Sequence, residues 1–121
     1  MTHALGHVAQ VARLKGAVVT GVGNIFCQGV DLHFLCSDHQ ERRKTNAALM
    51  ASAVERLTLT LSTFPKLLVA AVNGDASGLG VTLLPLFDVV YANDKAMFNT
   101  YFSRYLLECD LCDNKVIGDL L

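Results

Sequence analysis

An unbroken apolar run, Leu67 to Val72, limits the possible folds of this chain more than any other segment, and it ends at Asn73-Gly74. Six consecutive apolar residues without polar alternation are typical of a β-strand that is covered on both faces, as in a parallel sheet. Shorter strand-like segments occupy residues 17–20, 88–92 and 96–98. Because helical segments separate these strands, the sequence predicts an α/β domain.

Three segments have helical character. Apolar residues recur at near-helical spacing over residues 4–14 and again over 45–64, where Pro65 ends the stripe. The charged run at residues 41–44 is interpreted as the solvated start of the second helix. The apolar segment 81–87 is predicted to be a buried helix that ends or kinks at Pro85.

Length and composition restrict the function as well as the size. The 121 residues suffice for one domain, and 52% hydrophobic content excludes a disordered chain. A net charge of −1 argues against a nucleic-acid partner, because such proteins carry a basic face. Every apolar stretch is interrupted before it reaches the roughly 20 residues that span a bilayer, so we expect no membrane span.

Four cysteines occur without a secretory signal, which favours reduced thiols. Cys109 and Cys112 form a C-x-x-C pair, but no second pair completes a zinc site. A metal site that combines Cys27 and Cys36 with nearby histidines is less favoured than ordinary thiols, so no metal is predicted.

Two glycine-flanked turns, at residues 26–32 and 73–80, carry the clearest chemical signal. Amide N–H groups at such strand-to-helix turns lack internal acceptors and can bind an oxyanion or a phosphate. The second turn contains Gly78-Leu79-Gly80, which matches neither a dinucleotide fingerprint nor a P-loop. The residues alone therefore indicate an anion or oxyanion pocket, with two purely structural turns as the alternative.

Longer motifs around these turns point to a family. Residues 18–32, VVTGVGNIFCQGVDL, resemble the V-x-L-T-G-x-G-x-x-F-C-x-G-x-D-L segment of the crotonase (enoyl-CoA hydratase/isomerase) superfamily. Residues 69–98 resemble its next segment, in order and at family spacing. Within the superfamily, residues 82–88 and 98–100 are most similar to peroxisomal enoyl-CoA isomerases and chromodomain-Y-like proteins.

The resemblance implies a crotonase-like ββα spiral (ClpP/crotonase fold), with residues 1–121 forming a single partial domain that corresponds to the N-terminal half. It also implies an acyl-CoA thioester as ligand, whose oxygen is held by the backbone amides of Val30 and Leu79. No separate cofactor is expected, since coenzyme A is part of the substrate. The remaining residues implied to bind it are Gly29, Asp31, Gly78 and Gly80.

The expected chemistry depends on a proton-transferring group. Hydratases of the family use two glutamates, and Thr82 and Phe102 stand at those positions, so hydration is not expected. Peroxisomal isomerases use one later glutamate, whose place is taken by Asp110, with Glu108 nearby. The interpretation is a protein derived from an enoyl-CoA isomerase of unsaturated fatty acid β-oxidation. The alternative is a non-catalytic acyl-CoA-binding or protein-interaction module related to chromodomain-Y-like corepressors. In that case the two acids, Glu108 and Asp110, are solvated residues without a catalytic role.

The resemblance also implies partners and a compartment. Relatives form trimers, and we expect a homo-oligomer, because half a spiral would leave apolar faces exposed. The implied location is the peroxisomal or mitochondrial matrix, or the cytoplasm where no signal is supplied. The final residues, GDLL, are not a peroxisomal signal, and the basic residues in 1–15 resemble a transit peptide only weakly.

Overall fold

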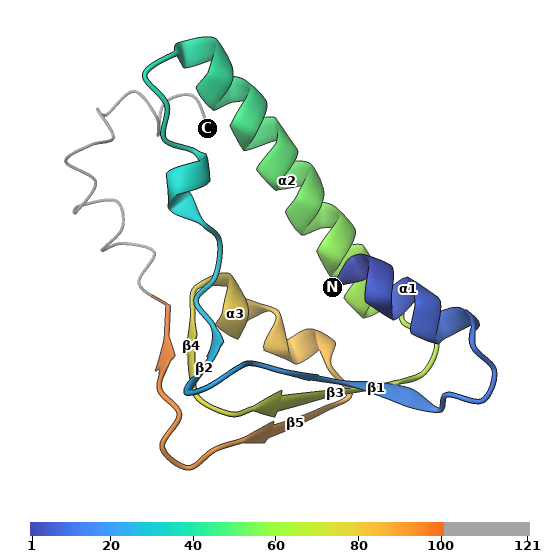
Figure 1. Cartoon of the computed structure of the whole chain (residues 1–121). Coiled ribbons are helices and arrows are strands. Elements are labelled where there is room, and N and C mark those ends of the chain that lie inside the picture. Colours follow the sequence, from blue (N-terminus) through green and yellow to red (C-terminus); the bar gives the residue numbers. More distant parts are fainter. Residues whose placement is uncertain (101–121) are drawn as a thin grey trace.

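A computed structural model describes residues 1–100 of the chain as two parallel sheets and a layer of helices (Figure 1). The first sheet has the order β1-β3-β5 and the second the order β2-β4-β6. Strands of the first sheet are β1 (Gly16–Thr20), β3 (Leu67–Val72) and β5 (Val89–Ala92). Strands of the second are β2 (Ile25–Cys27), β4 (Asp75–Ser77) and β6 (Phe98–Asn99). The helices are α1 (Thr2–Gln10), α2 (Gln40–Ser62), α3 (Leu79–Thr82) and two short 3₁₀ helices, Leu32–Phe34 and Leu84–Leu86.

The chain repeats one unit. Each time, it forms a strand of the first sheet and then a strand of the second, and after β2 and β4 it enters a helix. Because corresponding strands of successive units pair in parallel, the connections must cross back over the sheet, as α2 does between β2 and β3. This arrangement is the ββα spiral that the sequence predicted.

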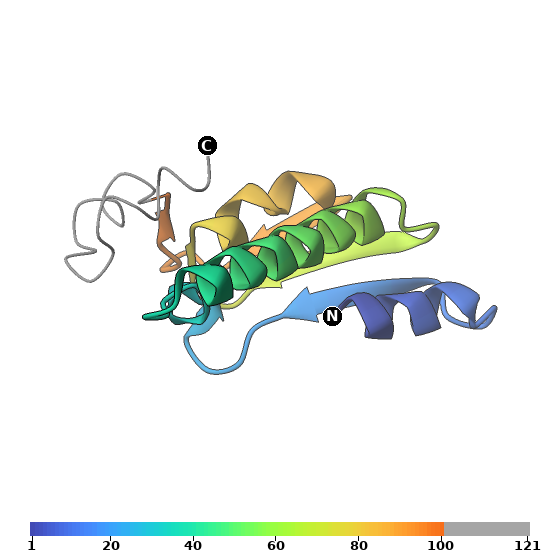
Figure 2. The same ribbon diagram turned by 90° about the horizontal axis from the view of Figure 1, so that it is seen from above.

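The core lies between the first sheet and the helices. Leu5 of α1, Leu61 of α2 and Leu68 of β3 are buried together, and the 3₁₀ segment after α3 packs against them. Seen from above in Figure 2, α2 runs along β3, and α3 lies on the side of α2 that faces away from β1. Leu68, Ala70 and Val72 alternate along β3 and point into this core, as side chains on one face of a strand must.

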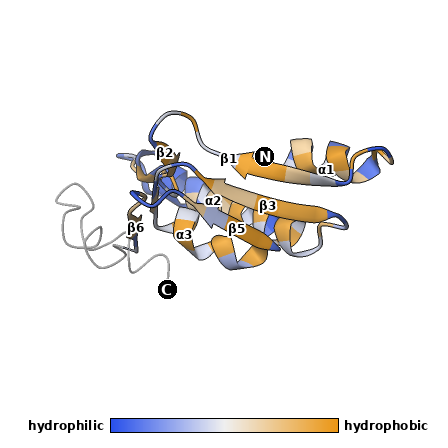
Figure 3. Ribbon diagram, turned by 90° about the horizontal axis from the view of Figure 1, so that it is seen from below, coloured by the Kyte–Doolittle hydropathy of each residue, from blue (hydrophilic) through white to orange (hydrophobic). Residues whose placement is uncertain are grey.

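The opposite face of the first sheet is largely uncovered within residues 1–100. Exposed fractions are 68% for Val18, 53% for Leu67 and 69% for Tyr91, one residue from each strand. Figure 3, which views the molecule from the side opposite α2, shows that these strands are mostly hydrophobic. The prediction that β3 is covered on both faces is therefore wrong for the described part of the chain, because only the α2 side has a packed layer.

The side chains of Lys66 and Asp88 form hydrogen bonds that hold α1 and β3 in place around the first sheet. The Lys66 ammonium donates hydrogen bonds of 2.7 Å to the carbonyls of Val8 and Val11, at the C-terminal end of α1. The Asp88 carboxylate accepts a 2.7 Å bond from the amide of Leu68, at the start of β3. Cations near helix C-termini are stabilising because the last carbonyls carry partial negative charge.

Element boundaries differ from the predictions at identifiable residues. The first helix ends at Gln10 rather than residue 14, since Val11 adopts an extended backbone and its carbonyl binds Lys66. α2 begins at Gln40, and the charged run lies in its first turns with an exposed 3.6 Å ion pair, Lys44–Glu41. The predicted helix 81–87 divides into α3 and a 3₁₀ segment, because Pro85 cannot continue an α-helix. Within residues 1–100, none of the helices combines the length and apolar character needed to cross a bilayer.

Candidate functional site

The two glycine-flanked turns lie at the ends of two paired strands. β2 and β4 run in parallel, and each leads within two residues to a glycine in the left-handed backbone region. Gly29 has a φ of 90° and Gly78 a φ of 51°. These angles are strained for other residues, so glycine is required where both strands turn toward the next element.

The turns contact each other at Gly29. A side-chain Cβ built on this glycine would lie 3.0 Å from the carbonyl oxygen of Ser77 and 3.3 Å from the amide nitrogen of Leu79. Val30 follows Gly29 directly, so its amide also lies at this junction. The structure therefore brings together two turns that are about fifty residues apart, as expected for equivalent strands in a parallel spiral.

Close packing of α3 on β2 holds the junction from the other side. Gly80 is buried, and a Cβ built there would lie only 2.7 Å from both the Cβ and the carbonyl oxygen of Cys27. The amide of Gly29 donates a 3.4 Å hydrogen bond to the Cys27 sulfur. Glycine at position 80 thus lets the start of α3, where Leu79 lies, approach β2 more closely than any other residue would permit.

The amides of Val30 and Leu79 are available to a ligand. Neither N–H donates to an acceptor within residues 1–100. Leu79 is the first residue of α3, where amides have no partner inside the helix. Val30 is 37% exposed, so this residue is in contact with solvent. Two unpaired donors at one surface-accessible junction can bind an anion or a carbonyl oxygen.

Other predicted residues have local roles or lie elsewhere. The Asp31 carboxylate accepts a 3.0 Å bond from the His33 amide and caps the 3₁₀ helix that follows. Thr82 is exposed on α3, and its hydroxyl bonds the Leu79 carbonyl at 3.3 Å. Asp110, Glu108 and Phe102, like Cys109 and Cys112, lie outside the described residues. Within residues 1–100, no group of three or more His, Cys, Asp or Glu is arranged to hold a metal ion.

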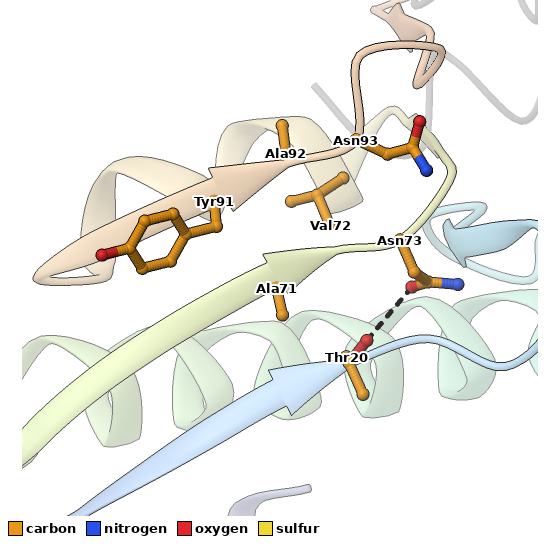
Figure 4. A pocket seen from close by; sticks show the side chains of 7 residues that line it. All are labelled: Thr20, Ala71, Val72, Asn73, Tyr91, Ala92 and Asn93. Atoms are coloured by element: carbon orange, nitrogen blue, oxygen red, sulfur yellow. Dashed lines mark hydrogen bonds between the residues drawn. The ribbon is translucent and has the colours of Figure 1, made fainter.

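Sequence reasoning missed the hydrogen bonds that the Asn73 side chain makes at the end of β3. A depression of about 290 Å³ lies at the C-terminal ends of β1, β3 and β5 (Figure 4). Within it, the Asn73 amide group points from the end of β3 toward Thr20 at the end of β1. The sequence places Asn73-Gly74 at the end of a strand and the start of a glycine-flanked turn, but the hydrogen-bond partners of Asn73 lie about fifty residues away and could not be deduced from it.

Comparison with known proteins decides the family. A model of the enoyl-CoA hydratase/isomerase family matches residues 1–112. The chain belongs to this family. Human chromodomain Y-like protein is 38% identical over 107 residues, which cover 88% of this chain and 18% of that protein. Mouse peroxisomal enoyl-CoA delta isomerase 3 is 41% identical over 87 residues, which cover 72% of this chain and 27% of that protein.

Solved structures confirm the fold. Pseudomonas aeruginosa DspI superposes with a TM-score of 0.69 and 26% identity, covering 80% of this chain and 38% of the other. An enoyl-CoA hydratase from Polaromonas sp. JS666 gives a TM-score of 0.65 and 32% identity, covering 80% and 37%. The crotonase-like fold of this family member is thus established, and the chain spans well under half the length of the proteins it matches.

Proposed function

We propose that this enoyl-CoA hydratase/isomerase family member binds acyl-CoA thioesters, with the thioester oxygen between the amides of Val30 and Leu79. The observation that carries the proposal is the contact between the two glycine turns, which leaves both N–H groups without an acceptor at one junction. Fixed donors of this kind stabilise negative charge on a carbonyl oxygen by several kcal/mol, because they need no reorganisation.

The reaction proposed is the conversion of a 3-enoyl-CoA to a 2-enoyl-CoA. A base removes a proton from C2, the resulting negative charge rests on the thioester oxygen, and the proton returns at C4 as the double bond moves. Asp110 is the proposed shuttle, by resemblance to the isomerases. Similarity to mouse enoyl-CoA delta isomerase 3 supports this class. Thr82, which carries no carboxylate, stands where hydratases have a glutamate and therefore disfavours hydration.

The experiment is a spectrophotometric assay of the purified chain with 3-hexenoyl-CoA. Formation of the conjugated 2-enoyl thioester raises the absorbance, and Asp110→Ala should eliminate the activity while leaving thioester binding measurable by calorimetry. Asp113→Ala, which removes a nearby acid of the same kind, is the matched control. An unchanged rate in Asp110→Ala would contradict the assigned shuttle, and failure of the parent chain to bind acyl-CoA would contradict the proposal as a whole.

A second function is favoured by a separate observation. Chromodomain Y-like protein matches more of this chain than the isomerase does, 88% against 72%. This similarity supports a non-catalytic acyl-CoA-binding or protein-interaction module. Binding of a thioester without turnover would distinguish this function from that of an isomerase.

The same proposal extends to assembly and compartment. The uncovered apolar face of the first sheet supports association with further copies of the chain, since exposed patches of this kind favour contacts. The mouse relative is named as peroxisomal, which supports that compartment, with the mitochondrial matrix as the alternative. Light scattering of the purified chain and imaging of a tagged full-length product test these two points.

A further inference from the structure

The register of pairing shifts once between β2 and β4, the two strands that lead to Val30 and Leu79. Ile25 of β2 pairs with Asp75 of β4, but the next pair joins Cys27 to Ala76, so Phe26 is an extra residue on β2. This irregularity is a bulge, which inserts one residue into one strand of a pair. Beyond the bulge, Val30 lies three positions after Cys27, and Leu79 lies three positions after Ala76.

Continued beyond the bulge, the register therefore places the amides of Val30 and Leu79 opposite each other. If the ladder continued regularly from the Ile25 pair, Gly29 rather than Val30 would lie opposite Leu79. Such a slip displaces each residue of β2 by about 3.3 Å, turns its side chain to the other face of the sheet and points its amide toward the opposite edge of the strand. The contact of Gly29 with Ser77 and Leu79 agrees with the bulged register.

A ladder this short does not specify its own register. β2 and β4 each have three residues, and their pairing is interrupted at Phe26. Register is weakly specified wherever few side chains distinguish the two faces, so another contact has to decide it. That contact should act near the start of both strands, where a slip would begin.

The Asn73 side chain meets this requirement. Its oxygen accepts bonds from the Gly21 amide at 2.8 Å and the Thr20 hydroxyl at 3.3 Å. Its nitrogen donates to the carbonyls of Gly23 at 2.8 Å and Ile25 at 3.4 Å. The Asn73 side chain is thus hydrogen-bonded to the segment that runs from Thr20, at the end of β1, to Ile25, the residue before the bulge. Because it lies two residues before Asp75, it fixes β2 directly against the start of β4.

We propose that Asn73 is a positioning residue that sets the bulged register of β2 and β4, and thereby the alignment of the Val30 and Leu79 amides. The inference rests on the proposed function for its consequence in thioester binding. The register itself is a property of the ligand-free chain. Both donor and acceptor of the side chain are needed, so neither Asp nor Ala replaces Asn.

Nuclear magnetic resonance of the full 121-residue chain tests the register without a ligand. Since a Cβ built on Gly80 would lie 2.7 Å from the Cβ of Cys27, a Gly80 Hα to Cys27 Hβ Overhauser contact is expected in the parent chain, and a slip of β2 by one residue would remove it. Asn73→Ala should lose this contact and keep those between β1 and β3. Asn93→Ala is the control, because Asn93 lines the same depression (Figure 4) but, within residues 1–100, its side chain bonds only the Lys95 amide.

Asn73→Asp provides a second variant of the same shape, which keeps the acceptor and loses the amide donor. Should Asn73→Ala not fold, loss of the Gly80–Cys27 contact in folded Asn73→Asp supports the proposal. A role in stability alone predicts that the folded fraction of every variant retains this contact. Retention in Asn73→Ala, or in Asn73→Asp where the alanine variant does not fold, overturns the proposal.

Thioester binding provides the functional readout. Hexadienoyl-CoA absorbs at longer wavelength when donors polarise its carbonyl, so the shift reports the two amides. We expect the shift to be lost and affinity to fall about 10- to 100-fold in Asn73→Ala, because misplacement on the ångström scale has effects of that order. Asn93→Ala should match the parent chain. A parent chain that does not bind overturns the proposed function, while the Overhauser comparison still decides the register.

Discussion

Adding one methyl group at Gly80 should separate the two amides while leaving the rest of the molecule folded. The Cβ of Gly80→Ala would lie 2.7 Å from the backbone oxygen of Cys27, whereas nonbonded contacts are favourable near 3.5 Å. α3 and β2 must therefore move apart by somewhat under 1 Å. A displacement of about 1 Å near reacting atoms costs on the order of 100-fold, so we expect thioester affinity or turnover to fall about 10- to 100-fold.

The effect on stability should be small by comparison. Overpacking costs about 1–3 kcal/mol, whereas replacing Gly by Ala inside a helix contributes about 1 kcal/mol. The free energy of unfolding should fall by about 0–2 kcal/mol, measured by urea denaturation followed by circular dichroism. Thioester binding is measured on the same samples by calorimetry.

Gly6→Ala is the matched control, because it makes the same substitution within a helix at a position with no atom within 4 Å of the new Cβ. It should raise the free energy of unfolding by about 0.5–1 kcal/mol and leave binding unchanged. If Gly80→Ala behaves like Gly6→Ala in both measurements, α3 does not approach β2 as closely as the structure indicates, and the reasoning about the junction is wrong.

Three further substitutions test the fold. Lys66→Met should lower the free energy of unfolding by about 1–3 kcal/mol, because two carbonyls at the end of α1 lose a charged donor, whereas Lys15→Met, at an exposed position, should change it little. Asp88→Ala should cost about 1–2 kcal/mol by leaving the Leu68 amide of β3 without its acceptor, and equal stability of Asp88→Ala and Asp88→Asn would contradict this assignment. Val18→Lys should reduce self-association in light scattering, since it charges the uncovered sheet face, and an unchanged mass would exclude that face as the contact.

Much of the fold could be predicted because its signals are long or rest on special residues. The run Leu67 to Val72 contains enough apolar residues to indicate a strand, and the glycines at 29 and 78 mark both turns. The strands β2 and β4 were missed because three residues are too few to show alternation. Covering on both faces was predicted from apolar content alone, which does not reveal whether a second layer is present.

The candidate site divides in the same way. Glycine types and family motifs predicted the segments that hold Val30 and Leu79, and the structure places their turns in contact. The bulge at Phe26 could not be predicted, because register is a property of two strands and no single segment contains it. The hydrogen bonds of Asn73 likewise join residues about fifty positions apart, which local sequence patterns do not reveal.

The alternation of the chain between two sheets bears on its biosynthesis. β1 pairs only with β3 among the described strands, and its partner lies about fifty residues downstream, so β1 cannot form its sheet hydrogen bonds until β3 has been made. A ribosome that makes about 5–20 residues per second leaves this apolar strand without its partner for several seconds. Because unpaired strand edges are prone to aggregation, we expect slower translation between β1 and β3 to increase aggregation of the product.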